Sequence, residues 1–173
     1  MHCLKNNRIT DISFFTQDAY TLAQQLIGKY ICRCENGVVS RHRITETECY
    51  IGTGDTACHA SKGRTKRTEV MWEKGGICYV YLCYGIHNML NFVSGSRQQP
   101  QAVLIRGVQG YNGPGKLTRA LCIDRSFNGE SLVDSSRIWL EDGESLPFKA
   151  TPRIGIGYAA EKDQQALWRF VAE

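Results

Sequence analysis

The sequence predicts an α+β fold, in which a mixed, mostly antiparallel and curved β-sheet is surrounded by helices. Strand-like runs outnumber helix-like runs, an Asn-Gly pair joins two of them, and only two segments have helical signals. The 173 residues, 42% of them hydrophobic and 22% charged, suit one domain with a sizeable core. We therefore expect residues 1–173 to form a single domain, with residues 1–12 as a flexible N-terminus.

The first helix is expected over residues 17–27. Its apolar side chains repeat at intervals of three and four, the spacing of an amphipathic helix: Ala19, Leu22, Ala23, Leu26 and Ile27. Thr16 is a suitable N-cap, because its hydroxyl can accept a hydrogen bond from a free N–H of the first turn. Gly28 is the expected stop.

Strands are expected over residues 29–34 and 38–50, because both runs are rich in residues that favour strands. Asn36-Gly37 between them indicates a tight hairpin, since both residues tolerate a positive φ. A polar, glycine-rich and irregular segment follows. Further strands are expected over residues 77–84, 90–93, 102–106 and 138–140, with a turn or loop over residues 94–100.

Two glycine-rich segments have functional interpretations. Gly113-Pro114-Gly115 precedes an expected helix over residues 116–123, and backbone N–H groups at such a helix start can bind a phosphate. Residues 153–157 are apolar and rich in glycine, which predicts a close approach of two backbones.

Bulk properties exclude several classes of protein. No apolar run approaches the roughly 20 residues of a membrane span, and the N-terminus lacks the apolar core of a signal peptide, so we expect a cytoplasmic protein. The eight cysteines include no Cys-x-x-Cys pair and only four histidines are present, which argues against zinc sites and disulfides. We expect free thiols packed as small apolar residues.

Residues 45–50 and 78–85 are the most informative stretches of the chain. In a strand, the period of two places Glu46, Glu48 and Tyr50 on one face. The second stretch places Tyr79 and Tyr81 on one face. A carboxylate beside several tyrosines suggests a site that stacks a flat ring and performs acid–base chemistry on it.

The formal net charge of +4 permits an anionic partner without requiring one. Four basic residues fall close together, namely Lys62, Arg64, Lys66 and Arg67. On charge alone, a solvated surface loop and a patch that binds nucleic-acid phosphates are equally good interpretations.

The ordered motifs, from about residue 16 to residue 170, resemble the alkyladenine (3-methyladenine) DNA glycosylase family. The resemblance rests on Thr47-Glu48-Cys49-Tyr50, His59-Ala60, Tyr79-Val80-Tyr81, Tyr84-Gly85, Asn91, Leu104-Ile105-Arg106 and Gly113-Pro114-Gly115-Lys116-Leu117. It implies a monofunctional base-excision-repair enzyme, without lyase activity, metal or other cofactor. Such an enzyme flips an alkylated or deaminated purine out of double-stranded DNA and hydrolyses the N-glycosidic bond, leaving an abasic site. It also implies a monomer with a β-hairpin that inserts into DNA, associated with the nucleoid if the source is bacterial.

By this resemblance Glu48 is the general base, and Glu46 on the same face is the runner-up carboxylate. Arg106 would lie beside the attacking water and the target phosphate and help to keep Glu48 ionised. Without the resemblance, Glu48 is better explained as a surface residue of an edge strand, and Arg106 as a charge at a strand end.

The resemblance also assigns the DNA contacts. Tyr50, His59 and Tyr81 would sandwich the flipped base, Asn91 would reject the exocyclic amine of guanine, and Tyr84 would fill the gap in the duplex. Without it, Tyr84 is better explained as a core aromatic. The expected backbone contacts are Lys62, Arg64, Lys66, Arg67 and Lys116.

The sequence departs from the family pattern in three places. Thr68 follows Arg67 where the family usually has Asn, and His87 and Asn88 replace more aromatic or apolar residues near Tyr84. The chain ends at Glu173, before the tail that the family normally adds. Two other functions remain: a non-catalytic binder of damaged DNA or structured RNA, and a small-molecule nucleoside hydrolase. A pure binder would not need Glu48 near phosphates, and a nucleoside hydrolase leaves the basic run and Tyr84 unexplained.

Overall fold

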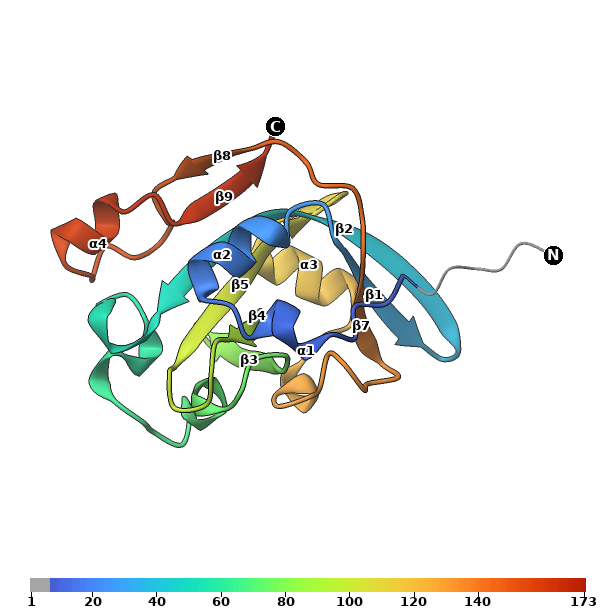
Figure 1. Cartoon of the computed structure of the whole chain (residues 1–173), viewed down its shortest axis with the longest axis horizontal. Coiled ribbons are helices and arrows are strands. Elements are labelled where there is room, and N and C mark those ends of the chain that lie inside the picture. Colours follow the sequence, from blue (N-terminus) through green and yellow to red (C-terminus); the bar gives the residue numbers. More distant parts are fainter. Residues whose placement is uncertain (1–6) are drawn as a thin grey trace.

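The computed structural model describes residues 7–173, and within them nine strands form one curved sheet that does not close into a barrel (Figure 1). The main strand order is β3-β4-β5-β2-β1-β7, with β6 paired to β5 and β9 paired to β2 and β8. All of these pairs are antiparallel, so the predicted α+β class is confirmed. The strands are β1 (Tyr30–Glu35), β2 (Val38–Ile51), β3 (Cys78–Cys83), β4 (His87–Ser94), β5 (Gln101–Val108), β6 (Tyr111–Asn112), β7 (Ile138–Glu141), β8 (Phe148–Thr151) and β9 (Arg169–Ala172).

Short helices complete the described chain. The α-helices are α1 (Ile12–Phe15), α2 (Ala19–Gln25), α3 (Pro114–Ala120) and α4 (Glu161–Gln165), and the 3₁₀-helices are η1 (Gly52–Gly54), η2 (His59–Lys62), η3 (Glu69–Trp72) and η4 (Arg125–Phe127). Residues 1–6 of the expected flexible N-terminus lie outside the described residues. From residue 7 the chain contacts the sheet edge, where the Ile9 N–H donates to the Leu140 carbonyl at 2.9 Å.

The first predicted helix is present but shorter, and its predicted N-cap is wrong. Asp18 caps α2, because its carboxylate accepts a hydrogen bond from the Thr21 N–H at 2.9 Å. Thr16 instead follows the last residue of α1, a one-turn helix that the sequence analysis missed. The helix ends at Gln25, close to the predicted stop at Gly28.

The hairpin prediction at Asn36-Gly37 is confirmed. Glu35 pairs with Val38, and the two turn residues have φ values of 50° and 78°. Other bounds differ: β4 begins at His87 rather than Leu90, because the turn before it is tight enough for pairing to start at once. The segment expected to be irregular over residues 52–63 contains η1 and η2. The β8–β9 hairpin and α4 were not predicted at all.

The sheet has a helix-covered face and a second face that carries the polar stretch of β2. On β2, Thr47 and Cys49 face the helices; Thr47 donates to the Ala23 carbonyl of α2 at 2.8 Å, and Cys49 joins the main core. That core includes Leu22, Leu26, Ile31, Ile44, Phe92, Val103, Ile105, Leu117 and Phe170. The alternate positions of β2, including Glu48 and Tyr50, are therefore on the other face, as the period of two predicts.

The C-terminal β8–β9 hairpin, red in Figure 1, lies on the side of the molecule that α2 also borders. The rings of Tyr20 in α2 and Phe170 in β9 are 5.3 Å apart in an edge-to-face arrangement. In addition, β9 pairs directly with β2 opposite Glu46 and Glu48. A segment from the end of the sequence thereby completes the sheet at its polar stretch.

The cysteines of residues 7–173 are all free thiols, as expected, and four are buried: Cys32, Cys49, Cys58 and Cys78. Burial raises the pKa of the Cys49 thiol to about 12, which suits a packing role rather than a reactive one. Cys122, in contrast, is exposed. No helix in this part of the chain is long and apolar enough to cross a membrane.

Candidate active site

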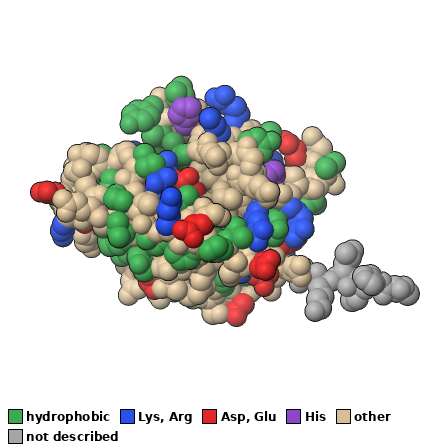
Figure 2. Space-filling view, turned by 90° about the horizontal axis from the view of Figure 1, so that it is seen from above, with side chains coloured by type: hydrophobic (Ala, Val, Ile, Leu, Met, Phe, Trp, Pro, Cys, Tyr) green, Lys and Arg blue, Asp and Glu red, His purple; other side chains and the backbone are tan. Residues whose placement is uncertain are grey.

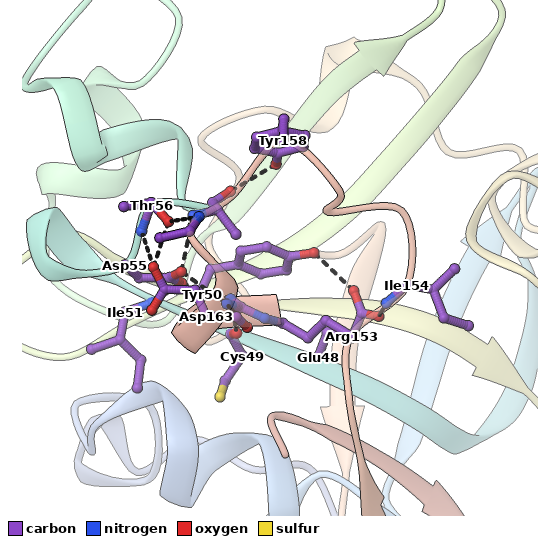
Figure 3. A network of polar contacts seen from close by, with 12 residues as sticks. Glu48, Cys49, Tyr50, Ile51, Asp55, Thr56, Arg153, Ile154, Tyr158 and Asp163 are labelled. Carbon is purple, nitrogen blue, oxygen red and sulfur yellow. Dashed lines mark hydrogen bonds and ion pairs between the residues drawn. The ribbon is translucent and has the colours of Figure 1, made fainter. Parts of the chain in front are cut away.

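Glu48 is a fully buried carboxylate at the centre of the polar sheet face, with 0% of its surface exposed. Its Oε2 accepts a hydrogen bond from the Tyr50 hydroxyl at 2.8 Å, and its Oε1 accepts one from the Ile154 N–H at 2.8 Å. The Nε of Arg106 lies 3.5 Å from Oε1. Figure 3 shows Tyr50 and the segment around Ile154 reaching Glu48 from opposite sides. The site holds an acidic group away from bulk water among three donors.

Burial raises the pKa of Glu48 above its usual value, and the Arg106 cation and the two hydrogen bonds oppose this shift. Burial also raises the pKa of Tyr50 well above its usual value, reinforced by the negative charge of Glu48. Tyr50 therefore stays protonated and donates. A carboxylate with a raised pKa, held in a fixed orientation, is a suitable general base.

Glu46, the runner-up carboxylate, is engaged by two arginines from neighbouring strands. Its Oε1 lies 3.0 Å from the Nε of Arg106 on β5 and 2.5 Å from the Nε of Arg169 on β9. The pairing of β2 with β5 shifts register on both sides of Glu46, which lies opposite Gly107. Such β-bulges redirect a side chain, and here they accompany the turn of Glu46 toward the arginines.

Arg153 and Asp55 form a buried ion pair behind Tyr50. Both side chains are 0% exposed, and the guanidinium donates to the two Asp55 carboxylate oxygens at 2.6 and 2.8 Å. The same guanidinium lies over the rings of Tyr50 and of Trp168, 4.8 Å from each ring centroid. Asp55 also accepts from the Ile51 N–H at 3.1 Å, so the pair fixes the end of β2 as well as the Tyr50 ring.

The predicted close approach of backbones at residues 153–157 is wrong. A Cβ added at Gly155 or Gly157 would meet no atom within 4 Å. The segment has a different role: it supplies the Arg153 side chain and the Ile154 N–H to the site. Gly155 adopts a φ of 75°, which allows the chain to turn away after that contact.

A narrow cavity of about 40 Å³ lies beside Tyr50 and has a largely aromatic lining. It is lined by Tyr50, Ala57, His59, Met71, Tyr79, Tyr81, Asn91, Ala102 and Tyr158. The ring centroids of His59 and Tyr81 are 4.6 Å apart at an interplanar angle of 74°. The predicted base-binding residues Tyr50, His59, Tyr81 and Asn91 are thus brought together.

His59 is held as a neutral ring. Burial, with a contribution from the nearby Arg67, lowers the pKa of His59 to about 4, whereas burial raises the pKa of Tyr79 to about 12. The Tyr79 hydroxyl and the His59 Nδ1 are 3.1 Å apart. Both groups are uncharged, and the His59 tautomer decides whether the phenol donates to Nδ1 or Nδ1–H donates to the phenol oxygen. Asn91 is oriented by donating to the Tyr79 carbonyl at 3.2 Å.

A wider groove of about 410 Å³ adjoins the cavity and shares Tyr50, His59, Tyr81 and Tyr158 with it. The rest of its lining is Arg67, Leu82, Cys83, Tyr84, Met89, Leu104, Arg106, Pro114, Ile154, Gly155 and Ile156. Glu48 lies directly behind this lining, since Tyr50, Arg106 and Ile154 contact it and also face the groove.

Tyr84 is 89% exposed at the tip of the hairpin between β3 and β4, where it borders the groove. Its φ of 50° and the φ of 69° at Gly85 match a type I′ turn, and the Ile86 N–H closes that turn on the Cys83 carbonyl. A bulky residue with a positive φ carries backbone strain of roughly 1–2 kcal/mol. The interpretation of Tyr84 as a core aromatic is therefore wrong.

The predicted phosphate contacts are all exposed, but they do not form one cluster in the groove. Arg67 lines the groove, with its guanidinium 5.1 Å from the Tyr81 ring centroid. The other four are absent from the groove lining: Lys62, Arg64, Lys66 and Lys116. Figure 2 shows basic side chains in small groups among apolar and acidic ones on one face of the molecule.

Sequence reasoning missed several site residues: Asp55, Arg153, Ile154, Tyr158 and Arg169. Tyr158 lines both the cavity and the groove, and its hydroxyl donates to the Ala57 carbonyl at 2.9 Å. An arginine at the start of an apolar, glycine-rich run was the one available signal for Arg153, because a charge there needs a partner. In residues 7–173, no three His, Cys, Asp or Glu side chains are grouped to hold a metal ion.

Comparison with known proteins gives a consistent result. The model of the methylpurine-DNA glycosylase (MPG) family matches residues 13–111 and 109–173. A protein of Borreliella afzelii is 43% identical over 177 residues, covering 94% of this chain and 95% of its own, and one of Psychrobacter cryohalolentis is 42% identical over 186 residues, covering 90% and 88%. One from Rickettsia rickettsii is 42% identical over 166 residues, covering 91% and 86%; all three are provisionally named 3-methyladenine DNA glycosylases. Matched along nearly its whole length, and with its site residues gathered around one buried carboxylate, the chain belongs to the methylpurine-DNA glycosylase family.

Proposed function

We propose that this protein is a DNA-repair glycosylase that flips alkylated or deaminated purines out of duplex DNA and hydrolyses their N-glycosidic bond, leaving an abasic site. The observation that carries the proposal is the buried Glu48 carboxylate, held by Tyr50, Ile154 and Arg106 directly behind a groove that continues into an aromatic cavity. Family membership and the names of the relatives agree with this activity.

In this mechanism Glu48 activates the attacking water. A carboxylate offers about four lone-pair positions, and Oε2 uses only one of them for Tyr50, so it can still accept a hydrogen bond from water. The sugar develops positive charge as the bond to the base breaks, and the negative Glu48 stabilises that charge while it takes the proton from water. Because Glu48 is fully buried in the free protein, the groove lining must shift when DNA binds for water to reach it.

The flipped base is held between the aromatic rings of the cavity, which is too narrow for a purine in the free protein and must widen toward the adjoining groove when DNA binds. Stacking contributes roughly 1–3 kcal/mol per base and accepts any flat ring. The neutral state of His59 keeps a positive charge away from alkylated bases, many of which are themselves cationic. We expect Asn91, whose amide donates to the Tyr79 carbonyl, to exclude the exocyclic amine of guanine.

Tyr84 serves as the wedge that occupies the gap left by the flipped nucleotide. Extruding a base costs a few kcal/mol of stacking and pairing, which an inserted side chain partly offsets. The exposed position and positive φ of Tyr84 support this role, since a strained, solvent-exposed aromatic residue contributes little to stability.

The reaction stops at base removal. A lyase step needs a nucleophilic amine at the sugar C1′. The residues that line the groove and the cavity include no lysine. Borohydride should therefore trap no covalent complex between the protein and DNA that carries a lesion or an abasic site.

The test is single-turnover base release from duplexes that carry one hypoxanthine, 1,N6-ethenoadenine or 3-methyladenine analogue. Glu48→Gln should bind the lesion duplex but release base at least about a thousandfold more slowly than the wild type. The matched control is Glu73→Gln, which removes a carboxylate paired with Arg97 and distant in sequence from Glu48. Release by Glu48→Gln at the wild-type rate would refute the role of Glu48, and binding without release by the wild type would favour the non-catalytic binder.

A further inference from the structure

Four charged side chains from three adjacent strands form a continuous ion-pair network on the polar sheet face. Arg169 on β9 contacts Glu46 on β2, and Glu46 contacts Arg106 on β5, through Nε–Oε1 distances of 2.5 and 3.0 Å. Arg106 then reaches Glu48, back on β2, at 3.5 Å. The network contains two carboxylates and two guanidiniums, so its formal charges balance.

The two contacts of Arg106 in this network differ in length. Its Nε is closer to Glu46 than to Glu48, and among the described residues these are its two ion pairs. Arg106 donates its hydrogen bond to Glu46, whereas its contact with Glu48 is an ion pair, and the pull of Glu46 on Arg106 would grow if Glu46 lost its other cation. Arg169 already neutralises Glu46, and it is itself held by donating to the Thr151 hydroxyl at 3.1 Å. Glu46 can therefore anchor Arg106 without removing its charge from Glu48.

We propose that Glu46 and Arg169 are positioning residues, which together hold Arg106 against Glu48 and set how strongly Arg106 favours the ionised form of that carboxylate. The proposal rests on the proposed role of Glu48 as the general base. In this arrangement Glu46 fixes the guanidinium on the sheet, and Arg169 cancels the negative charge that Glu46 brings near the site.

The charge balance is local, because few ionisable groups face Glu48. The groups that face Glu48 are Arg106 on β5, Tyr50 and Glu46 on β2, and Arg169 on β9. Arg169 is the residue of β9 that pairs with Glu48 in register. The segment before α4 contributes the Arg153 cation, which the bidentate contact with Asp55 neutralises. A change in the Glu46–Arg169 pair should therefore act on Glu48 through Arg106 and through direct charge.

The sign of each effect follows from this geometry. In Arg169→Met, the unneutralised Glu46 pulls Arg106 away and adds negative charge near Glu48, so ionised Glu48 is disfavoured and the acidic limb of the rate profile moves to higher pH. In Glu46→Gln, the amide oxygen can still accept the hydrogen bond from Arg106, but a negative charge is lost and the limb moves to lower pH. The double variant Glu46→Gln with Arg169→Met restores the charge balance.

The experiment measures single-turnover release of hypoxanthine from a duplex between pH 5 and pH 9 for each variant. We expect the acidic limb to move up by about one pH unit in Arg169→Met and down by about half a unit in Glu46→Gln. It should return to within about 0.3 units of the wild type in the double variant. Arg169→Lys, which keeps the charge, should also retain the wild-type limb. The matched control is Arg41→Met, which breaks the ion pair with Glu141 on β7 and should leave the profile unchanged.

A purely structural role would lower the melting temperature or the plateau rate of the single variants while the limb stayed in place, and that result would overturn the proposal. Limb shifts of the same sign in both single variants would also overturn it, as would a double variant that keeps the shift of either single one. Failure of the proposed function would appear differently: Glu48→Gln would then release base at the wild-type rate, whatever the behaviour of Arg169 and Glu46.

Discussion

Removal of one hydroxyl group, in Tyr50→Phe, should change the pH dependence of base release and little else. The Tyr50 hydroxyl donates to Glu48 Oε2 at 2.8 Å, and this hydrogen bond is one of the groups that hold down the pKa of a carboxyl that burial raises. Phe keeps the ring that lies over Arg153 and lines the cavity. The variant therefore separates the hydrogen bond from the stacking surface.

The expected size of the effect follows from the strength of that bond. A hydrogen bond to a charged group contributes about 1.5–3 kcal/mol, and one pH unit corresponds to about 1.4 kcal/mol. Because Ile154 and Arg106 continue to contact Glu48, we take the lower end, an upward shift of the acidic limb by about one unit. The general base acts when deprotonated, so below the limb the rate should fall about tenfold against the wild type. Well above the limb it should stay within about threefold.

The assay is single-turnover release of hypoxanthine across pH 5 to 9 with enzyme in excess. Tyr111→Phe is the matched control, because Tyr111 is a partly exposed tyrosine on β6 that lines neither the cavity nor the groove. An acidic limb that does not move in Tyr50→Phe would refute the reasoning. So would a uniform loss of rate at every pH, which would assign the hydroxyl to substrate binding instead.

Three further predictions concern stability and DNA binding. Burial raises the folded-state pKa of Glu48, so the associated stability is present below the unfolded-state pKa and is lost as the pH rises through the folded-state value. In calorimetry, Glu48→Gln should therefore melt about 2–5 °C above the wild type at pH 8 and at the same temperature as the wild type near pH 4. Equal melting temperatures at pH 8 would contradict this reasoning. Tyr84→Gly should relieve about 1 kcal/mol of backbone strain, raise the melting temperature by about 2–4 °C and slow base release from duplex DNA about tenfold. The control Asn36→Gly, at the remote β1–β2 hairpin, should leave the rate of base release unchanged. An equal or higher rate of release by Tyr84→Gly would exclude the wedge role of Tyr84. Arg67→Ala should make the slope of log DNA affinity against log salt concentration shallower by about 0.9. The control is Arg97→Ala, since Arg97 pairs with Glu73 and does not line the groove. An unchanged slope for Arg67→Ala would show that Arg67 contacts no phosphate.

Local signals predicted six of the nine strands, but not β6, β8 or β9. Asn36-Gly37 defined its own hairpin because the turn needs two residues that tolerate positive φ, and the period of two placed Glu48 and Tyr50 on one face without knowledge of any neighbour. The start of α2 was misjudged for an equally local reason. Thr16 and Asp18 are both good caps, and the sequence does not say which one the chain geometry selects.

The missed site residues all depend on long-range contacts. Arg153 meets Asp55 across 98 positions, and the Ile154 N–H meets Glu48 across 106. A backbone N–H has no sequence signature, and an arginine does not indicate which carboxylate it will contact. The resemblance to the family supplied the residues that we propose act on the base, whereas the residues that contact and orient them became visible only once β9 and the segment before α4 were placed.

The late arrival of these partners has a consequence for how the protein acquires activity. Arg169 meets Glu46 across 123 positions, so this contact closes a very long loop and should be among the last to form. Until β9 pairs with β2, Glu46 and Glu48 are two like charges at alternate positions of one strand, without Arg169 or the Ile154 N–H. A nascent chain on the ribosome, or one cleaved after β7, would therefore contain Glu48, Tyr50, His59 and Tyr81 and, on the function proposed above, still be inactive. The protein would therefore become active only when β9 has paired with β2 and the fold is complete.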